Sequence, residues 1–119
     1  GHGVMEDFSC LPRLYRDSAV NELWEGPRNV LLTQIHRDLQ KAAAWYPPAQ
    51  WVADTLQGHD PGVVKALGAE LEDLAAHPDL FHMDDATLAM CRQWDDFCHR
   101  FFHAYQDLAL DEVLAATPR

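Results

Sequence analysis

Features typical of membrane-embedded or secreted proteins are missing from this sequence. No apolar run approaches the roughly 20 residues of a membrane-spanning helix, and Gly1-His2-Gly3 is not followed by the basic and apolar segments of a signal peptide. Cysteine is scarce, with Cys10, Cys91 and Cys98. On one helix, Cys91 and Cys98 would lie about 10 Å apart, too far for a disulfide. We therefore expect reduced thiols and a cytoplasmic protein.

Basic residues are also few. The chain has 9 Lys and Arg against 19 Asp and Glu, for a net charge of −10. The imbalance falls mainly after residue 50, where four basic residues face thirteen acidic ones. An acidic surface repels phosphate backbones and anionic lipid headgroups, so we expect neither a nucleic acid nor a membrane as a partner. A solvated acidic face is the simplest interpretation.

No alternating strand pattern, internal repeat or low-complexity tract occurs, and 48% of the 119 residues are hydrophobic. Prolines, aspartates and helical spacing of apolar residues instead predict an all-α, antiparallel helical bundle. The expected helices cover Leu11–Asp17, Pro27 to about Trp45, Pro48–Leu56, Pro61–Ala76, and a last helix capped by Asp84 or Asp85. Residues 107–117 either continue this last helix or start a final turn. Residues 20–24 are expected to be irregular or extended.

Two of these helices have long apolar stripes. The stripe of the second helix is formed by Leu31, Ile35, Leu39 and Ala42. The stripe of the last helix has the three-four spacing of a bundle seam, and it is widened by Phe97 and Phe102. Its members are Leu88, Cys91, Trp94, Cys98, Phe101, Tyr105 and Leu108. The aromatic part of this stripe is either a packed core, a ligand groove or a subunit interface, and core packing is the favoured interpretation.

The segment Trp24-Glu25-Gly26 is the stretch best suited to chemistry. A carboxylate that removes a proton from a weak carbon acid must be a strong base, and burial raises the pKa of Glu above its usual value of about 4.3. A glycine after the base lets the backbone approach a ligand, and the amide groups of the turn can polarise a carbonyl oxygen. The alternative is that Glu25 complements the dipole of the following helix.

Together with Arg16-Asp17 eight residues earlier, this turn resembles the C-terminal signature of flavin-dependent acyl-CoA dehydrogenases. The resemblance implies that Glu25 removes the α-proton of an acyl-CoA thioester while FAD accepts hydride from the β-carbon. It also implies that Trp24 lines the acyl pocket and that Gly26 shapes the turn. An electron-transfer acceptor and a homo-oligomer are implied for the whole enzyme.

Further positions match this family in part. Gly1 and Gly3 resemble the end of a glycine-rich turn that touches FAD of a neighbouring subunit. Asn29 stands where a glutamine is common, and Pro27 stands where a threonine often contacts the flavin adenylate, so both depart from the pattern. Arg37 matches an arginine that can contact coenzyme A; the alternative is a solvated helix charge.

The resemblance covers about a third of the chain. It implies that residues 1–46 end the dehydrogenase C-terminal domain and that residues 47–119 are a helical extension. The extended alkylation-response branch is similar but has a basic DNA-binding face, so we expect an extended enzyme without a DNA role. The chain has no initiator Met, and we expect it to be a fragment that binds no FAD alone. The alternative is a non-catalytic helical oligomerisation or assembly module.

His99 and His103 are four residues apart on the expected last helix. Such a pair can ligate zinc, but the Glu of a His-Glu-x-x-His motif is absent. A solvated polar face is the favoured interpretation, so we predict no metal site.

Overall fold

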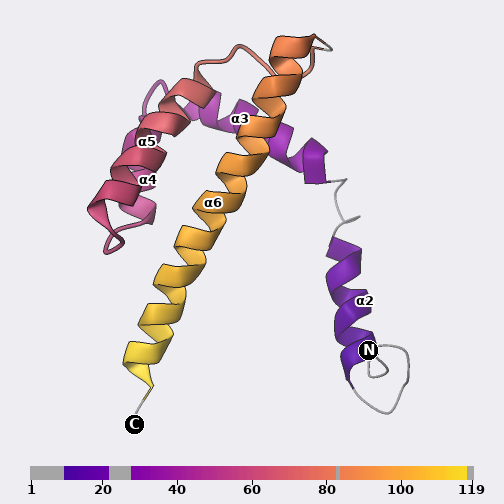
Figure 1. The fold of residues 1–119 in the computed structure, drawn as a ribbon, viewed down its shortest axis with the longest axis vertical. Coiled ribbons are helices and arrows are strands. Elements are labelled where there is room, and N and C mark those ends of the chain that lie inside the picture. Colours follow the sequence, from indigo (N-terminus) through magenta and orange to yellow (C-terminus); the bar gives the residue numbers. More distant parts are fainter. Residues whose placement is uncertain (1–9, 22–27, 83, 118–119) are drawn as a thin grey trace. The chain divides into compact units, whose positions relative to one another are not determined.

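The computed structural model describes residues 10–21, 28–82 and 84–117. Over these residues every regular element is an α-helix and no strand occurs, as the sequence predicted (Figure 1). The chain divides into two compact units, residues 1–31 and residues 32–119, and each is described by itself. The boundary expected at residues 46 and 47 depends on the resemblance to a family, and it stays a prediction.

In the first unit, helix α2 covers Leu11–Asn21. The sequence-based prediction ended this helix at Asp17 and made Val20 irregular or extended, which is wrong. The next helix-breaking residue after Pro12 is Gly26, so nothing in the intervening sequence ends the helix at Asp17.

Helix α3 covers Arg28–Ala42, and its residues from Leu32 onward belong to the second unit. It ends three residues before the expected Trp45 because the amides of Trp45 and Tyr46 both donate to the carbonyl of Ala42, at 3.0 and 2.8 Å. Pro47 follows this turn. The helix was therefore predicted correctly, apart from its last turn.

The following two helices, α4 (Pro48–Thr55) and α5 (Pro61–Ala75), form a hairpin, as expected. Each begins with a proline at its first position. The Asp60 carboxylate accepts a hydrogen bond from the Val63 amide at 3.0 Å and caps α5. Between the helices, Gly58 has φ of 101°, a conformation that costs little only for glycine.

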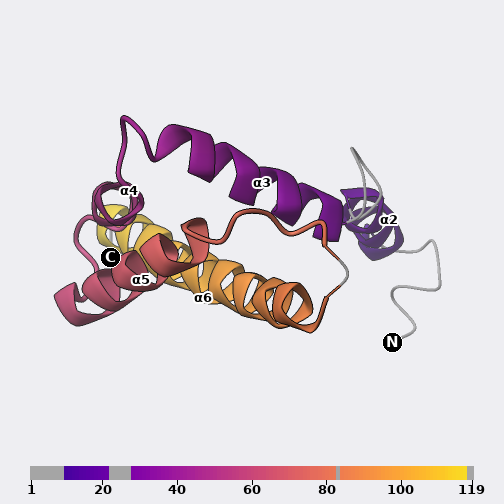
Figure 2. The same ribbon diagram turned by 90° about the horizontal axis from the view of Figure 1, so that it is seen from above.

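Helix α6 covers Asp85–Ala116 and runs in roughly the opposite direction to α5 (Figures 1 and 2). Its core residues include Trp94 and Phe97, each 2% exposed. The predicted seam is wrong at Leu88 and Tyr105, which are about half exposed, and Phe102 also lies in solvent. The buried face is instead centred on Phe97. The other buried apolar residues are Val52, Leu56, Leu67, Leu71, Leu74, Leu80 and Ala104.

No helix of the described residues is long and apolar enough to cross a membrane. The three cysteines form no disulfide among the described residues.

The cap of α6 makes a pH-dependent contribution to stability. The Asp84 carboxylate accepts hydrogen bonds from the Thr87 amide at 2.8 Å and the Thr87 hydroxyl at 3.1 Å. The hydrogen bond from the Thr87 amide lowers the pKa of the Asp84 carboxyl group below its usual value of 3.8. A lowered folded-state pKa stabilises the protein above pH 3.8, and this stabilisation is lost as the pH falls through the folded-state pKa.

We therefore expect Asp84→Asn to flatten the acid limb of the stability curve, measured as the free energy of unfolding in urea from about pH 5 downward. Asp111→Asn, near the opposite end of α6, is the matched control and should keep the wild-type slope. An acid limb of unchanged slope in Asp84→Asn would contradict the role of the cap.

Candidate functional site

The predicted catalytic turn precedes α3 in the sequence. Trp24, Glu25 and Gly26, as well as Gly1 and Gly3, lie outside the described residues. Their roles therefore stay predictions. The remaining predicted site residues, Asn29 and Arg37, both lie on α3.

Asn29 lies in the first turn of α3, and its side chain is exposed. Its Oδ1 atom accepts a hydrogen bond from the amide of Val30 at 3.1 Å.

Arg37 contacts an aromatic ring. Its Cζ atom lies 4.7 Å from the centroid of the Phe81 ring, within the range of a cation–π interaction. Phe81 belongs to the segment between α5 and α6 and is 60% exposed. Arg37 is thus an exposed cation held against the segment between α5 and α6, and the interpretation of a freely solvated helix charge is incomplete.

Polar side chains of α3 hold this helix on the end of α5. His36 is 1% exposed, and its Nε2 atom donates to the carbonyl of Leu74 at 2.8 Å. Because a carbonyl oxygen only accepts, the Nε2 atom carries a hydrogen. Gln40 Nε2 donates to the carbonyls of Ala75, at 3.1 Å, and His77. Carbonyls at a helix C-terminus need such partners.

A side chain of α6 also forms a hydrogen bond to α3. Trp94 Nε1 donates to the carbonyl of Leu32 at 2.7 Å. The Trp94 ring also meets the edge of His36, with centroids 5.3 Å apart, and stacks on Phe97 at 5.6 Å. Figure 1 shows α3 crossing the first half of α6, and Trp94 belongs to that half of the helix.

We call His36, Gln40 and Trp94 the helix clamp. These three residues were not identified as a group from the sequence. The apolar stripe predicted for α3 was wrong at Ile35, which is 48% exposed, while His36 next to it is buried. A signal was present: Leu32, His36 and Gln40 repeat at intervals of four residues and therefore share one face. Because two of these three side chains are polar, the face was not recognised as a buried one.

Two histidines of α6 form a pair. The Nε2 atoms of His99 and His103 lie 3.1 Å apart, and both side chains are exposed. Within residues 10–21, 28–82 and 84–117 there is no group of three or more histidine, cysteine or carboxylate side chains placed to hold a metal ion. Among the described residues, no third side chain therefore joins these two imidazoles to complete a metal site.

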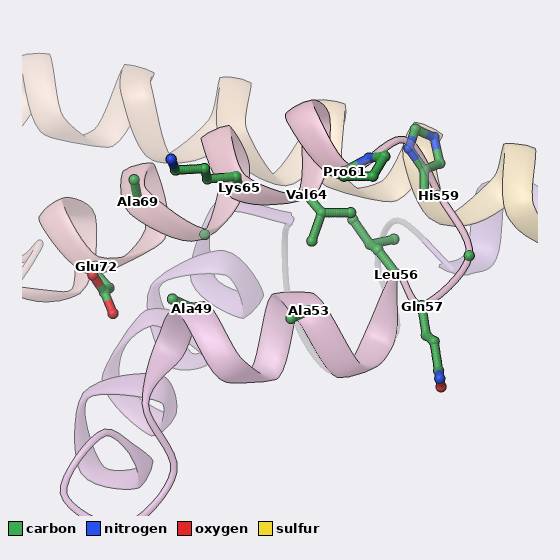
Figure 3. Close-up of a pocket in the computed structure, with 12 residues that line it drawn as sticks. Ala49, Ala53, Leu56, Gln57, His59, Pro61, Val64, Lys65, Ala69 and Glu72 are labelled. Atoms are coloured by element: carbon green, nitrogen blue, oxygen red, sulfur yellow. The ribbon is translucent and has the colours of Figure 1, made fainter.

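A hollow of about 550 Å³ lies along the α4–α5 hairpin (Figure 3). Small side chains form much of it, and a Cβ atom on Gly68 would lie 3.3 Å from that of Ala49. Lys65 and Glu72 of α5 supply its charged groups. None of the site residues predicted from the sequence lines this hollow.

Comparisons with known proteins give one local similarity. Over 46 residues, or 39% of this chain, the sequence is 46% identical to the putative acyl-CoA dehydrogenase AidB of Escherichia coli (strain K12). The match covers 8% of that protein's length. No protein-family model and no solved structure matches the chain.

Proposed function

We propose that this chain is part of an extended acyl-CoA dehydrogenase that removes a proton and a hydride from an acyl-CoA thioester. The observation that carries the proposal is the 46% identity over 46 residues to a putative acyl-CoA dehydrogenase. The Trp24-Glu25-Gly26 turn supports it, because a desolvated carboxylate is the base that this reaction needs. The match spans a small share of the relative, so the activity of the whole protein is part of the proposal.

In this mechanism the carboxylate of Glu25 takes the α-proton of the thioester. Trp24 is proposed to line the acyl pocket beside this carboxylate, because a carboxylate is a stronger base when it is shielded from water. Gly26 allows the turn to approach the thioester, and a backbone N–H stabilises the negative charge that develops on the thioester oxygen. Only interactions that strengthen with this charge lower the barrier.

The proposed cofactor is FAD, which when bound supplies the acceptor for the β-hydride. Asn29, whose side chain is exposed in the first turn of α3, is a proposed contact with it. Gly1 and Gly3 are the other proposed contacts. The reduced cofactor needs an electron-transfer acceptor as partner.

The helical extension has a mechanical role in this proposal. The clamp of His36, Gln40 and Trp94 ties α3 to α5 and α6, and Glu25 precedes α3 by three residues in the sequence. The extension thereby restricts the helix that directly follows the base. Its four basic and thirteen acidic residues after residue 50 argue against a DNA role.

The test is anaerobic mixing of an acyl-CoA with the purified full-length protein that carries this chain. We expect the visible absorbance of oxidised flavin to bleach in one phase that saturates with acyl-CoA. A full-length protein that retains FAD but does not bleach with acyl-CoAs of short, long and branched chains would refute the proposal.

A non-catalytic assembly module is the second candidate, and the C-terminal part of α6 favours it. Large apolar side chains are exposed there, at Phe102, Leu110, Val113 and Leu114, and contiguous apolar surface is typical of interfaces. A homo-oligomer is compatible with both candidates. If assembly is the sole function, the full-length protein will associate, as light scattering can show, but will not bind FAD.

A further inference from the structure

We propose that Phe81 is a positioning residue that holds Arg37 ready for the phosphate groups of coenzyme A. The inference rests on the proposed function, in which the substrate is an acyl-CoA, and on the match of Arg37 to an arginine that can contact coenzyme A in acyl-CoA dehydrogenases. What is new is the role of a residue of the helical extension in substrate binding. The basis is the 4.7 Å separation between the Arg37 Cζ atom and the Phe81 ring centroid.

The segment that carries Phe81 is anchored on both sides of the ring. The Phe81 amide donates to the Asp79 carboxylate at 2.8 Å, and the same carboxylate pairs with His82 Nε2 at 3.3 Å. Leu80 is 8% exposed and packs in the core. An anchored Leu80 and an exposed Phe81 place the aromatic ring on the surface, and the ring is therefore available as a fixed support.

The other partner is fixed as well. Arg37 directly follows His36, whose ring is buried and bonded to Leu74, and it precedes Gln40, which bonds the carbonyls of Ala75 and His77. These bonds set the rotation of α3 about its axis. The clamp thus presents Arg37 on the side of the helix where Phe81 lies.

The geometry leaves the guanidinium able to bind an anion. A ring over one face of the guanidinium leaves N–H groups at its edge, and these groups match phosphate oxygens. Among the described residues, no carboxylate lies within salt-bridge distance of Arg37, whereas Lys41 on the same helix pairs with Asp38 at 3.4 Å. In a chain of net charge −10, a cation held in place in this way is suited to an anionic ligand.

Holding Arg37 in place improves binding because less side-chain freedom is lost when the phosphate arrives. The expected effect of losing Phe81 is that of an exposed cation–π contact, about a two- to fivefold change in affinity. Losing Arg37 removes a charged hydrogen-bond partner, and a roughly tenfold or larger change is expected.

A double-mutant cycle tests the inference in the full-length, FAD-loaded protein. We expect Phe81→Ala to raise KM for acyl-CoA and Kd for free coenzyme A about two- to fivefold, with kcat and FAD content unchanged. In the Arg37→Ala background, Phe81→Ala should have no further effect. Phe81→Trp should keep wild-type binding because the ring is retained. Trp45→Ala, which removes another exposed aromatic ring, is the matched control and should change nothing.

The inference would be overturned if KM and Kd were unchanged in Phe81→Ala. It would also be overturned if Phe81→Ala raised Kd equally in the wild type and in the Arg37→Ala background. If the Arg37→Ala variant binds coenzyme A normally, Arg37 does not contact coenzyme A, and this result would also overturn the inference. None of these results touches the role of Glu25, because bleaching of the flavin by acyl-CoA would still occur. Failure of the inference is therefore distinguishable from failure of the proposed function.

Discussion

Replacing Glu25 by glutamine is expected to lower the rate of acyl-CoA-dependent flavin reduction by about 10²- to 10⁴-fold, the usual contribution of a general base. Glutamine has nearly the same shape as glutamate but cannot take a proton. The loss should appear in kcat, because the proton is transferred in the transition state and the substrate still fits the site. Rapid mixing with anaerobic detection of the flavin absorbance measures this rate.

Two measurements make the result specific to Glu25. The FAD content of Glu25→Gln should equal that of the wild type, which excludes a folding defect. Glu22→Gln removes a carboxylate of the same kind three residues earlier and should keep the wild-type rate. Reduction at the wild-type rate by Glu25→Gln would assign the base to another residue and leave Glu25 a structural role.

The second large effect is expected for stability. Trp94→Ala should lower the free energy of unfolding of the chain by about 3–5 kcal/mol, because it leaves a cavity where a large ring was packed. Trp94 is 2% exposed and contacts His36 and Phe97. The substitution also removes the donor to the Leu32 carbonyl. Urea denaturation followed by far-ultraviolet circular dichroism measures this change without depending on tryptophan fluorescence.

Two further variants separate packing from hydrogen bonding. Trp94→Phe keeps an aromatic ring but loses the indole N–H, and it should cost about 1–3 kcal/mol if the Leu32 carbonyl is left without a partner. Trp45→Ala removes a tryptophan that is 77% exposed and should change the free energy of unfolding by less than about 0.5 kcal/mol. Equal losses for Trp94→Ala and Trp45→Ala would contradict the clamp.

The helices could be predicted because their ends are encoded locally. Pro48 and Pro61 mark helix starts, and Asp60 and Asp84 cap helices through their own side chains. The end of α2 was predicted less well, because no strong breaker follows Asp17 before Gly26.

Buried faces were harder to predict because they depend on neighbouring helices. His36 is buried in place of Ile35, since the carbonyl of Leu74 offers its ring a partner. In α6, Phe97 rather than Leu88 lies in the core. Sequence spacing identifies a stripe, but the elements packed against it decide which part of the stripe is covered.

The candidate site was predicted from a short motif, and the Glu25 turn itself lies outside the described residues. The contact between Arg37 and Phe81 could not be predicted, because it joins α3 to the segment between α5 and α6, which is distant in the sequence. Such contacts follow from the packing of α3 on α5 and α6, which local spacing does not encode.

The central claim is that Glu25 removes the α-proton of an acyl-CoA, and hydrogen exchange tests it most directly. The full-length protein is incubated in D₂O with an acyl-CoA analogue that cannot lose the β-hydride, and deuterium at the α-carbon is measured by NMR. We predict rapid exchange with the wild type and with Glu22→Gln, and exchange at the rate of buffer alone with Glu25→Gln. Rapid exchange with Glu25→Gln would contradict the account.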